Sequence, residues 1–291
     1  MPWYSKYLTF FEKPFDMVPA SVMQEIRENM KSFQSPAPLA SVVVIAHNEE
    51  KRLLSCLWSL SENICDFPIE IIGIDNNSTD KTSRIFEAAG IKWYLEEEKG
   101  PGHARSCGLA HAKGRFYFSM DGDTLYPPLY LQTMLHELRK PGMAAVCGSY
   151  SFAPEEGYSA FKLKVYELFR DIHSKALSYR SPEWIARGAT LAYVTAIGRK
   201  VGYRVNIRAG EDGALVLGLK KHGKVTFILN RKARAITGAT PLREEGTLWE
   251  NFLKKLKKEI RHIKRYVATQ EVYEDQESNL ILKADRKTTS R

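Results

Sequence analysis

Residues 41–49 read SVVVIAHNE, and residues 69–80 read IEIIGIDNNSTD. In each stretch a run of mostly β-branched residues gives way to short polar residues, and RFYFSMDGD at 115–123 repeats the pattern with aromatic residues. Between the first two stretches, residues 49–61 carry leucines at helical spacing. Strands that alternate with helices through short connections form a mainly parallel sheet with right-handed crossovers. The sequence therefore predicts an α/β fold.

Clusters of polar residues lie at the carboxyl ends of three of the predicted strands, at 46–49, 75–80 and 121–124. One such cluster is ordinary turn and helix-cap chemistry, and we expect Ser78 or Thr79 to cap the helix that follows. The carboxyl ends of parallel strands, however, meet at one edge of a sheet, where α/β proteins bind their ligands. Three coincident clusters therefore predict a binding site at that edge.

Two acidic pairs carry the most chemistry. Asp121 and Asp123 flank a glycine, and hard divalent cations prefer carboxylate oxygens and commonly bridge a protein to substrate phosphates. Glu211 and Asp212 precede a helical run at 213–222, and a carboxylate at a helix N-terminus is stabilised as the anion that a general base must be. Taken alone, each pair is also compatible with a solvated turn or a helix cap.

The stretch from Ser41 to about Lys224 resembles the family 2 glycosyltransferases, which have the GT-A fold. Each motif is weak alone, but five in this order over nearly two thirds of the chain are specific. The fold implied is a mainly parallel central sheet flanked by helices, and helical spacing of apolar residues outside the matched stretch adds helical N- and C-terminal extensions. The matching segments are IAHNE at 45–49, IDNNSTD at 74–80, GPGHARSCGLA at 100–110, the DXD motif DGD at 121–123, and GED at 210–212.

The resemblance implies a role for each matching residue. Asp123 is the implied ligand of Mn²⁺ or Mg²⁺, and Asp212 is the implied base that deprotonates the acceptor hydroxyl. The resemblance also places Glu211, Trp184 and Arg187 on the acceptor side of the site. The implied nucleotide-binding residues are Ala46, His47, Glu49, Asp75 at the base, Arg105 near the phosphates, and Asp121 near the ribose.

The implied reaction inverts the anomeric centre of a nucleotide-diphospho-sugar donor in a single displacement. Two departures from the family pattern stand out. Asn76 and Asn77 replace the usual Asp-Gly, and Ser106 stands where Asn is common. Neither departure touches the implied metal ligand or base, so we expect activity. The Gln-x-x-Arg-Trp motif of processive members is missing from the sequence, which favours transfer of one sugar.

We expect the 291 residues to divide into three segments. A leader spans 1–38, and a catalytic domain spans 39–237. The nucleotide-binding half of that domain is 39–125, the acceptor half is 126–237, and a basic helical extension covers 238–291.

Much of the net charge of +9 lies in residues 247–269, where apolar residues recur at helical spacing and the segment contains seven Lys or Arg but only two Glu. Such a segment either lies on an anionic membrane or packs on the catalytic domain with a solvated basic face. Nucleic acid is not an expected partner, because no recognition motif accompanies the charge. The expected acceptor is a glycan or a lipid-linked molecule.

The four cysteines form no CxxC pair, and no signal peptide is recognisable, so we expect a cytoplasmic protein, with peripheral contact at the inner membrane face as an option.

Two other classes of protein stay open. A nucleotidyltransferase also uses paired carboxylates, but its glycine-rich, basic signature is missing from the first strand. The second class is a non-catalytic nucleotide-sugar-binding module. Loss of Asp123 or Asp212 would favour it, but both residues are present.

Overall fold

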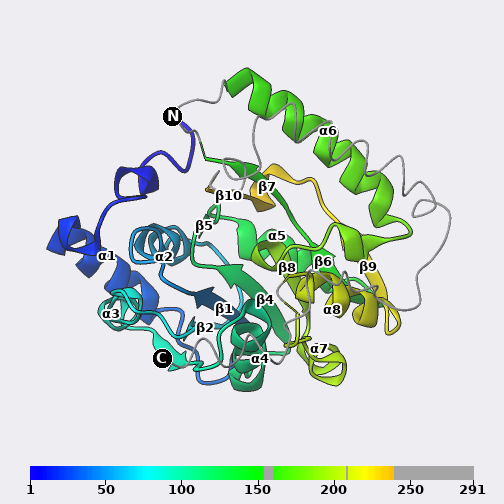
Figure 1. Ribbon diagram of the computed structural model, residues 1–291, viewed down its shortest axis with the longest axis horizontal. Helices are drawn as coiled ribbons and strands as arrows, with labels where there is room; N and C mark the ends of the chain where they lie inside the picture. Colours follow the sequence, from blue (N-terminus) through cyan, green and yellow to red (C-terminus); the bar gives the residue numbers. More distant parts are fainter. Residues whose placement is uncertain (154–159, 208, 239–291) are drawn as a thin grey trace.

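A central sheet of seven strands in the order β3-β2-β1-β4-β8-β6-β9 organises the molecule (Figure 1). The computed structural model describes residues 1–153, 160–207 and 209–238. Only β8 runs antiparallel to its neighbours β4 and β6, which confirms the predicted mainly parallel sheet. The strands are β1 (Ala40–Ala46), β2 (Ile69–Asp75), β3 (Lys92–Leu95), β4 (Phe116–Asp121), β6 (Met143–Cys147), β8 (Leu191–Val194) and β9 (Lys224–Phe227).

A smaller sheet in the order β5-β10-β7 lies beside the first. It joins β5 (Thr124–Leu125), which follows the DXD motif, to β10 (Arg234–Thr237) and β7 (Ser149–Phe152). This sheet therefore links the end of β4 to the last described strand of the chain.

Helices cover both faces of the large sheet because its central strands are apolar on both sides. Side chains that alternate along β1 point to opposite faces, so Val42 and Val44 belong to one hydrophobic cluster and Val43 to another. Helices α1, α2, α3 and α5 contribute to the first cluster, and α4, α7 and α8 to the second. Their bounds are α1 (Ala20–Lys31), α2 (Leu53–Ser61), α3 (Thr82–Ala89), α4 (Pro101–His111), α5 (Tyr130–Leu138), α7 (Thr195–Val201) and α8 (Glu211–Lys220), with α6 (Ala160–Ser178) at the outer edge and short 3-10 helices at Tyr7–Thr9, Phe15–Met17, Pro182–Trp184, Gly188–Thr190 and Arg231–Ala233.

The N-terminal segment 1–38 packs onto this domain. Tyr7, Ile26 and Met30 are almost fully buried within the first hydrophobic cluster, and Ser55 donates a hydrogen bond to the Tyr7 carbonyl at 2.9 Å. The apolar spacing of the segment thus places one side of α1 in the core of the catalytic domain.

Two sequence predictions about helix starts need correction. The helix expected from Glu49 begins at Leu53. Ser78 does not cap α3, since its hydroxyl accepts a hydrogen bond from the Asn48 N–H at 2.9 Å. The N-cap position is Lys81, which makes no side-chain cap hydrogen bond, and the Asp80 carboxylate before it accepts from the Thr82 N–H at 2.9 Å.

The predicted C-terminal extension, including the basic segment 247–269, lies outside the described residues, apart from Gly238. Within the described ranges, no helix combines the length and the apolar character needed to cross a membrane.

Candidate active site

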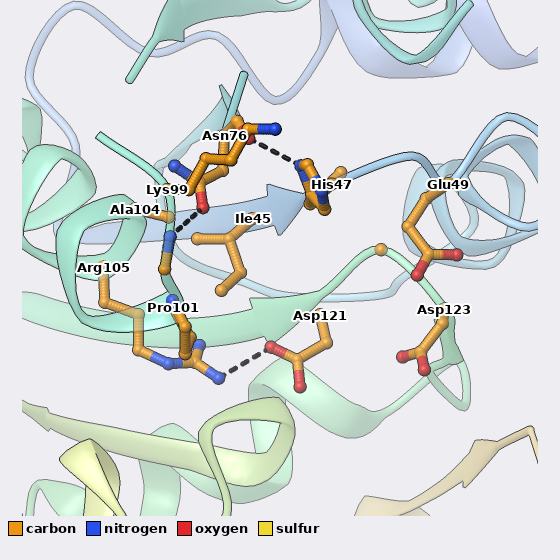
Figure 2. Close-up of a pocket in the computed structure, with 13 residues that line it drawn as sticks. Ile45, His47, Glu49, Asn76, Lys99, Pro101, Ala104, Arg105, Asp121 and Asp123 are labelled. Carbon is orange, nitrogen blue, oxygen red and sulfur yellow. Dashed lines mark hydrogen bonds and ion pairs between the residues drawn. The ribbon is translucent and has the colours of Figure 1, made fainter. Parts of the chain in front are cut away.

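A pocket of about 290 Å³ opens at the carboxyl ends of β1, β2 and β4 (Figure 2). Six of the predicted donor-site and metal-site residues line it: Ala46, His47, Glu49, Arg105, Asp121 and Asp123. The fold thus brings side chains that are up to 77 positions apart in sequence to one edge of the sheet. The remaining lining residues are Ile45, Asn76, Lys99, Gly100, Pro101, Ala104 and Gly122.

Three carboxylates give one side of this pocket its charge. Figure 2 shows Glu49 and Asp123 facing each other, with Asp121 beside them. Burial, and then the neighbouring Asp123 carboxylate, raise the pKa of Glu49 to about 8. Burial, and then Asp121, also raise the pKa of Asp123 above its usual range. The raised pKa values mean that this pocket disfavours the carboxylate anions unless a cation lies beside them.

A divalent cation would favour the ionised form of these carboxyls. Among the described residues, no group of three or more His, Cys, Asp or Glu side chains is arranged to hold a metal ion alone. Mg²⁺ typically binds through one or two protein carboxylates and takes the rest of its ligands from water and substrate phosphates. A pocket with paired aspartates and room for a ligand matches that donor set.

Arg105, on α4, connects the two halves of the site. Its guanidinium is buried and pairs with Asp121 at 2.9 Å, while it also donates to the Ser119 hydroxyl at 2.7 Å. On its other side, Nε lies 3.1 Å from Asp212 and 3.5 Å from Glu211. The dashed line in Figure 2 marks the pair with Asp121. Arg105 therefore fixes the DXD motif relative to the start of α8.

Asp212, the predicted base, lies at the start of α8 beside Arg105. Its Oδ2 accepts a 2.6 Å hydrogen bond from the Gly188 N–H, whereas Oδ1 accepts no hydrogen bond from the described residues. Burial raises the pKa of Asp212 to about 7, although the Arg105 guanidinium opposes the shift. Oδ1 instead lies 3.1 Å from the Arg105 Nε, and a carboxyl with a pKa near neutrality suits proton abstraction.

Gly188 allows this arrangement because it leaves space for Arg105. A methyl group at Gly188 would lie 1.8 Å from the guanidinium Nη2. We expect Gly188→Ala to displace the Arg105 head group and to lower transfer activity by roughly tenfold, because misplaced groups lose productive geometry. The stability cost should stay within ~1–3 kcal/mol, the usual range for overpacking. Steady-state kinetics and thermal melting measure the two effects.

Gly148→Ala is the matched control for this prediction. Gly148 donates its N–H to the Thr190 carbonyl in the same region, but a methyl group there would meet its nearest neighbours only at 3.4 Å. An equal loss of activity in both variants would contradict the role assigned to Gly188.

Asp75 does not line the pocket. It is 4% exposed, and its carboxylate accepts a hydrogen bond from the Ser78 N–H at 3.0 Å. Asn76 lines the pocket in its place. The Asn76 amide donates to the Glu98 carbonyl at 2.7 Å and accepts from the Gly100 N–H at 2.8 Å. A carboxylate cannot donate in this way, so the departure from the family's Asp at this position fits a role in bracing the loop before α4.

Asn77, the second departure, has a φ of 56°. This left-handed region favours Gly and tolerates Asn, which explains why Asn replaces the family's glycine. Sequence reasoning noted only that Asn76 and Asn77 replace the usual Asp-Gly of the family. Because Asn is one of the few residues that tolerate a positive φ, Asn77 in place of the family's Gly could have predicted the left-handed turn.

The acceptor-side predictions fall near Asp212 rather than in the pocket. Glu211 is buried beside Arg105. Arg187 is exposed and directly precedes Gly188, and Trp184 is partly buried at the end of a 3-10 helix. Sequence reasoning missed Tyr126, whose hydroxyl accepts from the Asp121 N–H at 3.1 Å and donates to the Ala189 carbonyl at 3.0 Å. It thereby ties the DXD strand to the loop whose Gly188 N–H donates to Asp212.

Comparison with known proteins identifies the class. The model of the family described as Glycosyl transferase family 2 matches residues 41–195, more than half of the chain. The chain therefore belongs to glycosyl transferase family 2. It is a glycosyltransferase, and this membership decides against the nucleotidyltransferase alternative.

Individual relatives agree with this class. An uncharacterized glycosyltransferase of Rickettsia prowazekii is 25% identical over 248 residues, which cover 77% of this chain and 74% of that protein. The dolichyl-phosphate beta-glucosyltransferase of Mus musculus is 30% identical over 144 residues, 43% of this chain and 44% of the relative.

A solved structure supports the fold. The mannosyltransferase PcManGT from Pyrobaculum calidifontis, in complex with GDP-Man and Mn²⁺, is similar with a TM-score of 0.56 at 20% identity. The match covers 88% of this chain and 71% of that one. The likeness, together with the sheet order, confirms the predicted GT-A fold.

Proposed function

We propose that this glycosyltransferase moves a single sugar from a nucleotide-diphospho-sugar to an acceptor hydroxyl with inversion, and that it depends on Mn²⁺ or Mg²⁺. One observation carries the proposal. The Arg105 guanidinium joins Asp121, in the donor pocket, to Asp212, at the start of α8. A donor and a base held on opposite sides of one buried cation suit a displacement between two bound substrates.

In the proposed mechanism Asp212 accepts the proton of the acceptor hydroxyl. The acceptor oxygen then forms a bond to the anomeric carbon, and the bond from that carbon to the diphosphate breaks, with its electron pair passing to the leaving oxygen. Asp121 and Arg105 hold the donor side in place, and Lys99 adds a cation at the pocket. When bound, Mn²⁺ or Mg²⁺ would be held by Asp123, with Asp121 nearby, and would neutralise charge on the diphosphate.

The acceptor is proposed to be a glycan or a lipid-linked molecule, as in polysaccharide or glycan assembly. The mouse relative is named for dolichyl phosphate, which supports the lipid-linked option. The cysteine pattern favours a cytoplasmic location, and the basic segment 247–269 favours peripheral contact with the inner membrane face. In this proposal residues 39–125 form the nucleotide-binding half and residues 126–237 the acceptor half of the domain.

A donor screen tests the proposal. We expect one of a panel of UDP- and GDP-sugars, with Mn²⁺ present, to raise the melting temperature of the full chain, because ligand binding stabilises by mass action. That donor should also be hydrolysed slowly without an acceptor, and EDTA should abolish both effects. Binding without any turnover would instead support a non-catalytic nucleotide-sugar-binding module. Turnover that withstands EDTA would reject metal dependence.

A further inference from the structure

A buried serine lies in the core of strand β4, beside Arg105. Residues 116–118 and 120 of this strand are aromatic or aliphatic, and Ser119 stands between them. Ser119 is 1% exposed, and its hydroxyl accepts a hydrogen bond from Arg105 Nη1 at 2.7 Å. A buried polar group costs free energy unless it is hydrogen-bonded. The contact with Arg105 therefore accounts for a serine at this position of an otherwise apolar run.

Arg105 needs a fixed orientation because three carboxylates surround it. Nη2 lies 2.9 Å from Asp121, and Nε lies 3.1 Å from Asp212 and 3.5 Å from Glu211. Attraction between charges depends on their separation and not on direction, so the carboxylates alone leave the head group free to move among them. The guanidinium is a rigid planar fork. The hydrogen bond from its third nitrogen, Nη1, to Ser119 therefore fixes how the whole head group is rotated.

A second buried hydroxyl supports this contact. Tyr203, in the loop after α7, interacts through its hydroxyl with Ser119. The Tyr193 hydroxyl, on β8, donates to the Tyr203 hydroxyl at 3.1 Å. Gly198 leaves room for this arrangement, since a methyl group there would lie 2.2 Å from the Tyr193 ring. The Ser119 hydroxyl is thus part of a buried network of neutral hydroxyls.

We propose that Ser119 is a positioning residue of the active site and that Tyr203 acts through it. Ser119 holds the Arg105 head group so that Nε faces Asp212, and it thereby sets how strongly the guanidinium favours the Asp212 anion. The inference rests on the proposed function, in which Asp212 is the base. Ser119 itself contacts neither substrate in this proposal.

Loss of the Ser119 hydroxyl should draw Arg105 away from Asp212. A buried N–H without an acceptor is costly, so Nη1 should move to the side where water can accept from it. That side is the donor pocket, because the Asp121 side chain is 31% exposed and that of Asp212 only 14%. Burial raises the pKa of Asp212, and Arg105 opposes the rise. Withdrawal of Arg105 should therefore raise this pKa further.

A carboxyl titration tests the inference on the full chain. The Asp212 signal is followed by ¹³C NMR in protein labelled at the Asp carboxyls, and it is assigned with Asp212→Asn. Ser119→Ala should raise the midpoint by at least about 0.4 pH units, the scale of one neutral hydrogen bond. The acidic limb of kcat/KM should move by the same amount. The substitution leaves in place the other titratable groups that face Asp212, which are Glu211, Asp121, Arg187, Cys147, Tyr117 and Tyr203.

Ser55→Ala is the matched control. Ser55 is also fully buried, and its hydroxyl donates to the Tyr7 carbonyl at 2.9 Å on α2, away from the pocket. It should leave the Asp212 midpoint unchanged even if it lowers the melting temperature as much as Ser119→Ala does. Tyr203→Phe should give a smaller rise in the same direction. Added to Ser119→Ala, it should have no further effect, because members of one hydrogen-bond network are not additive.

Three results would contradict the inference. An Asp212 midpoint that is the same in Ser119→Ala and in the parent chain removes Ser119 from the positioning role. An equal rise in Ser55→Ala would do so too, because general loosening of the core would then explain both. A further rise when Tyr203→Phe is added to Ser119→Ala shows that Tyr203 does not act through Ser119. The titration needs neither donor nor acceptor, so a parent chain that transfers no sugar contradicts the proposed function and leaves the positioning of Arg105 to the NMR result.

Discussion

Asp212→Asn should bind the nucleotide-sugar as tightly as the parent chain and yet transfer sugar at least about 100-fold more slowly, the scale of a lost general base. The amide oxygen can still accept the Gly188 N–H, so the loop geometry should persist. Arg105 also retains Asp121 and Glu211 as partners. The variant thus removes the proton acceptor and leaves the donor pocket intact. Donor titration and single-turnover transfer measure the two steps separately.

The pH profile supplies an independent readout of the same residue. A base must be ionised, and burial raises the pKa of Asp212 to about 7. In the parent protein kcat/KM should therefore rise with pH through about 7, and fall about tenfold per pH unit below it. The Asn variant should lack this acidic limb in its residual activity.

Glu211→Gln is the matched control, because it removes a buried carboxylate one residue away that also faces Arg105. It should retain most of the transfer activity and the acidic limb. If Glu211→Gln is the slower variant, or if Asp212→Asn loses donor affinity at an unchanged transfer rate, Asp212 is a structural cap of α8.

Asp123→Ala should lose metal-dependent donor binding and lower turnover by about 100-fold or more, the scale of removing one group that stabilises developing charge. The fold should survive, since the side-chain hydrogen bond that Asp123 makes with the described residues is the one it accepts from the Thr124 hydroxyl, at 2.9 Å. Calorimetric titration with UDP and GDP, each with and without Mn²⁺, measures the loss. In the parent protein Mn²⁺ should tighten binding of one of the two diphosphates.

Asp66→Asn controls for the general effect of removing a surface acid. Asp66 is exposed and precedes β2, so it lies at the opposite edge of the parallel sheet from Asp123. It should leave metal-dependent binding unchanged. Metal-dependent binding that persists at the parent level in Asp123→Ala would remove Asp123 from the metal site.

Local sequence was sufficient for the sheet. The apolar runs ending at Ala46, Asp75 and Asp121 are long enough, and the connections short enough, to leave parallel pairing as the favoured arrangement. The same patterns placed Glu49, Arg105 and Asp123 in one pocket, because the carboxyl ends of parallel strands share an edge. The pairing of the small sheet was not predicted, since its strands are short and join distant segments.

What the sequence by itself determined is the α/β fold, the family, and the edge of the sheet where the chemistry lies, because strand and helix periods and short motifs are local properties. What only the tertiary structure decided is how the charges meet. The contact of Arg105 with both Asp121 and Asp212 spans up to 107 positions, and it exists because Gly188 leaves room for the guanidinium. The raised pKa of Asp212 likewise depends on what packs against that residue. Burial is a property of the folded chain, and no local pattern specifies it.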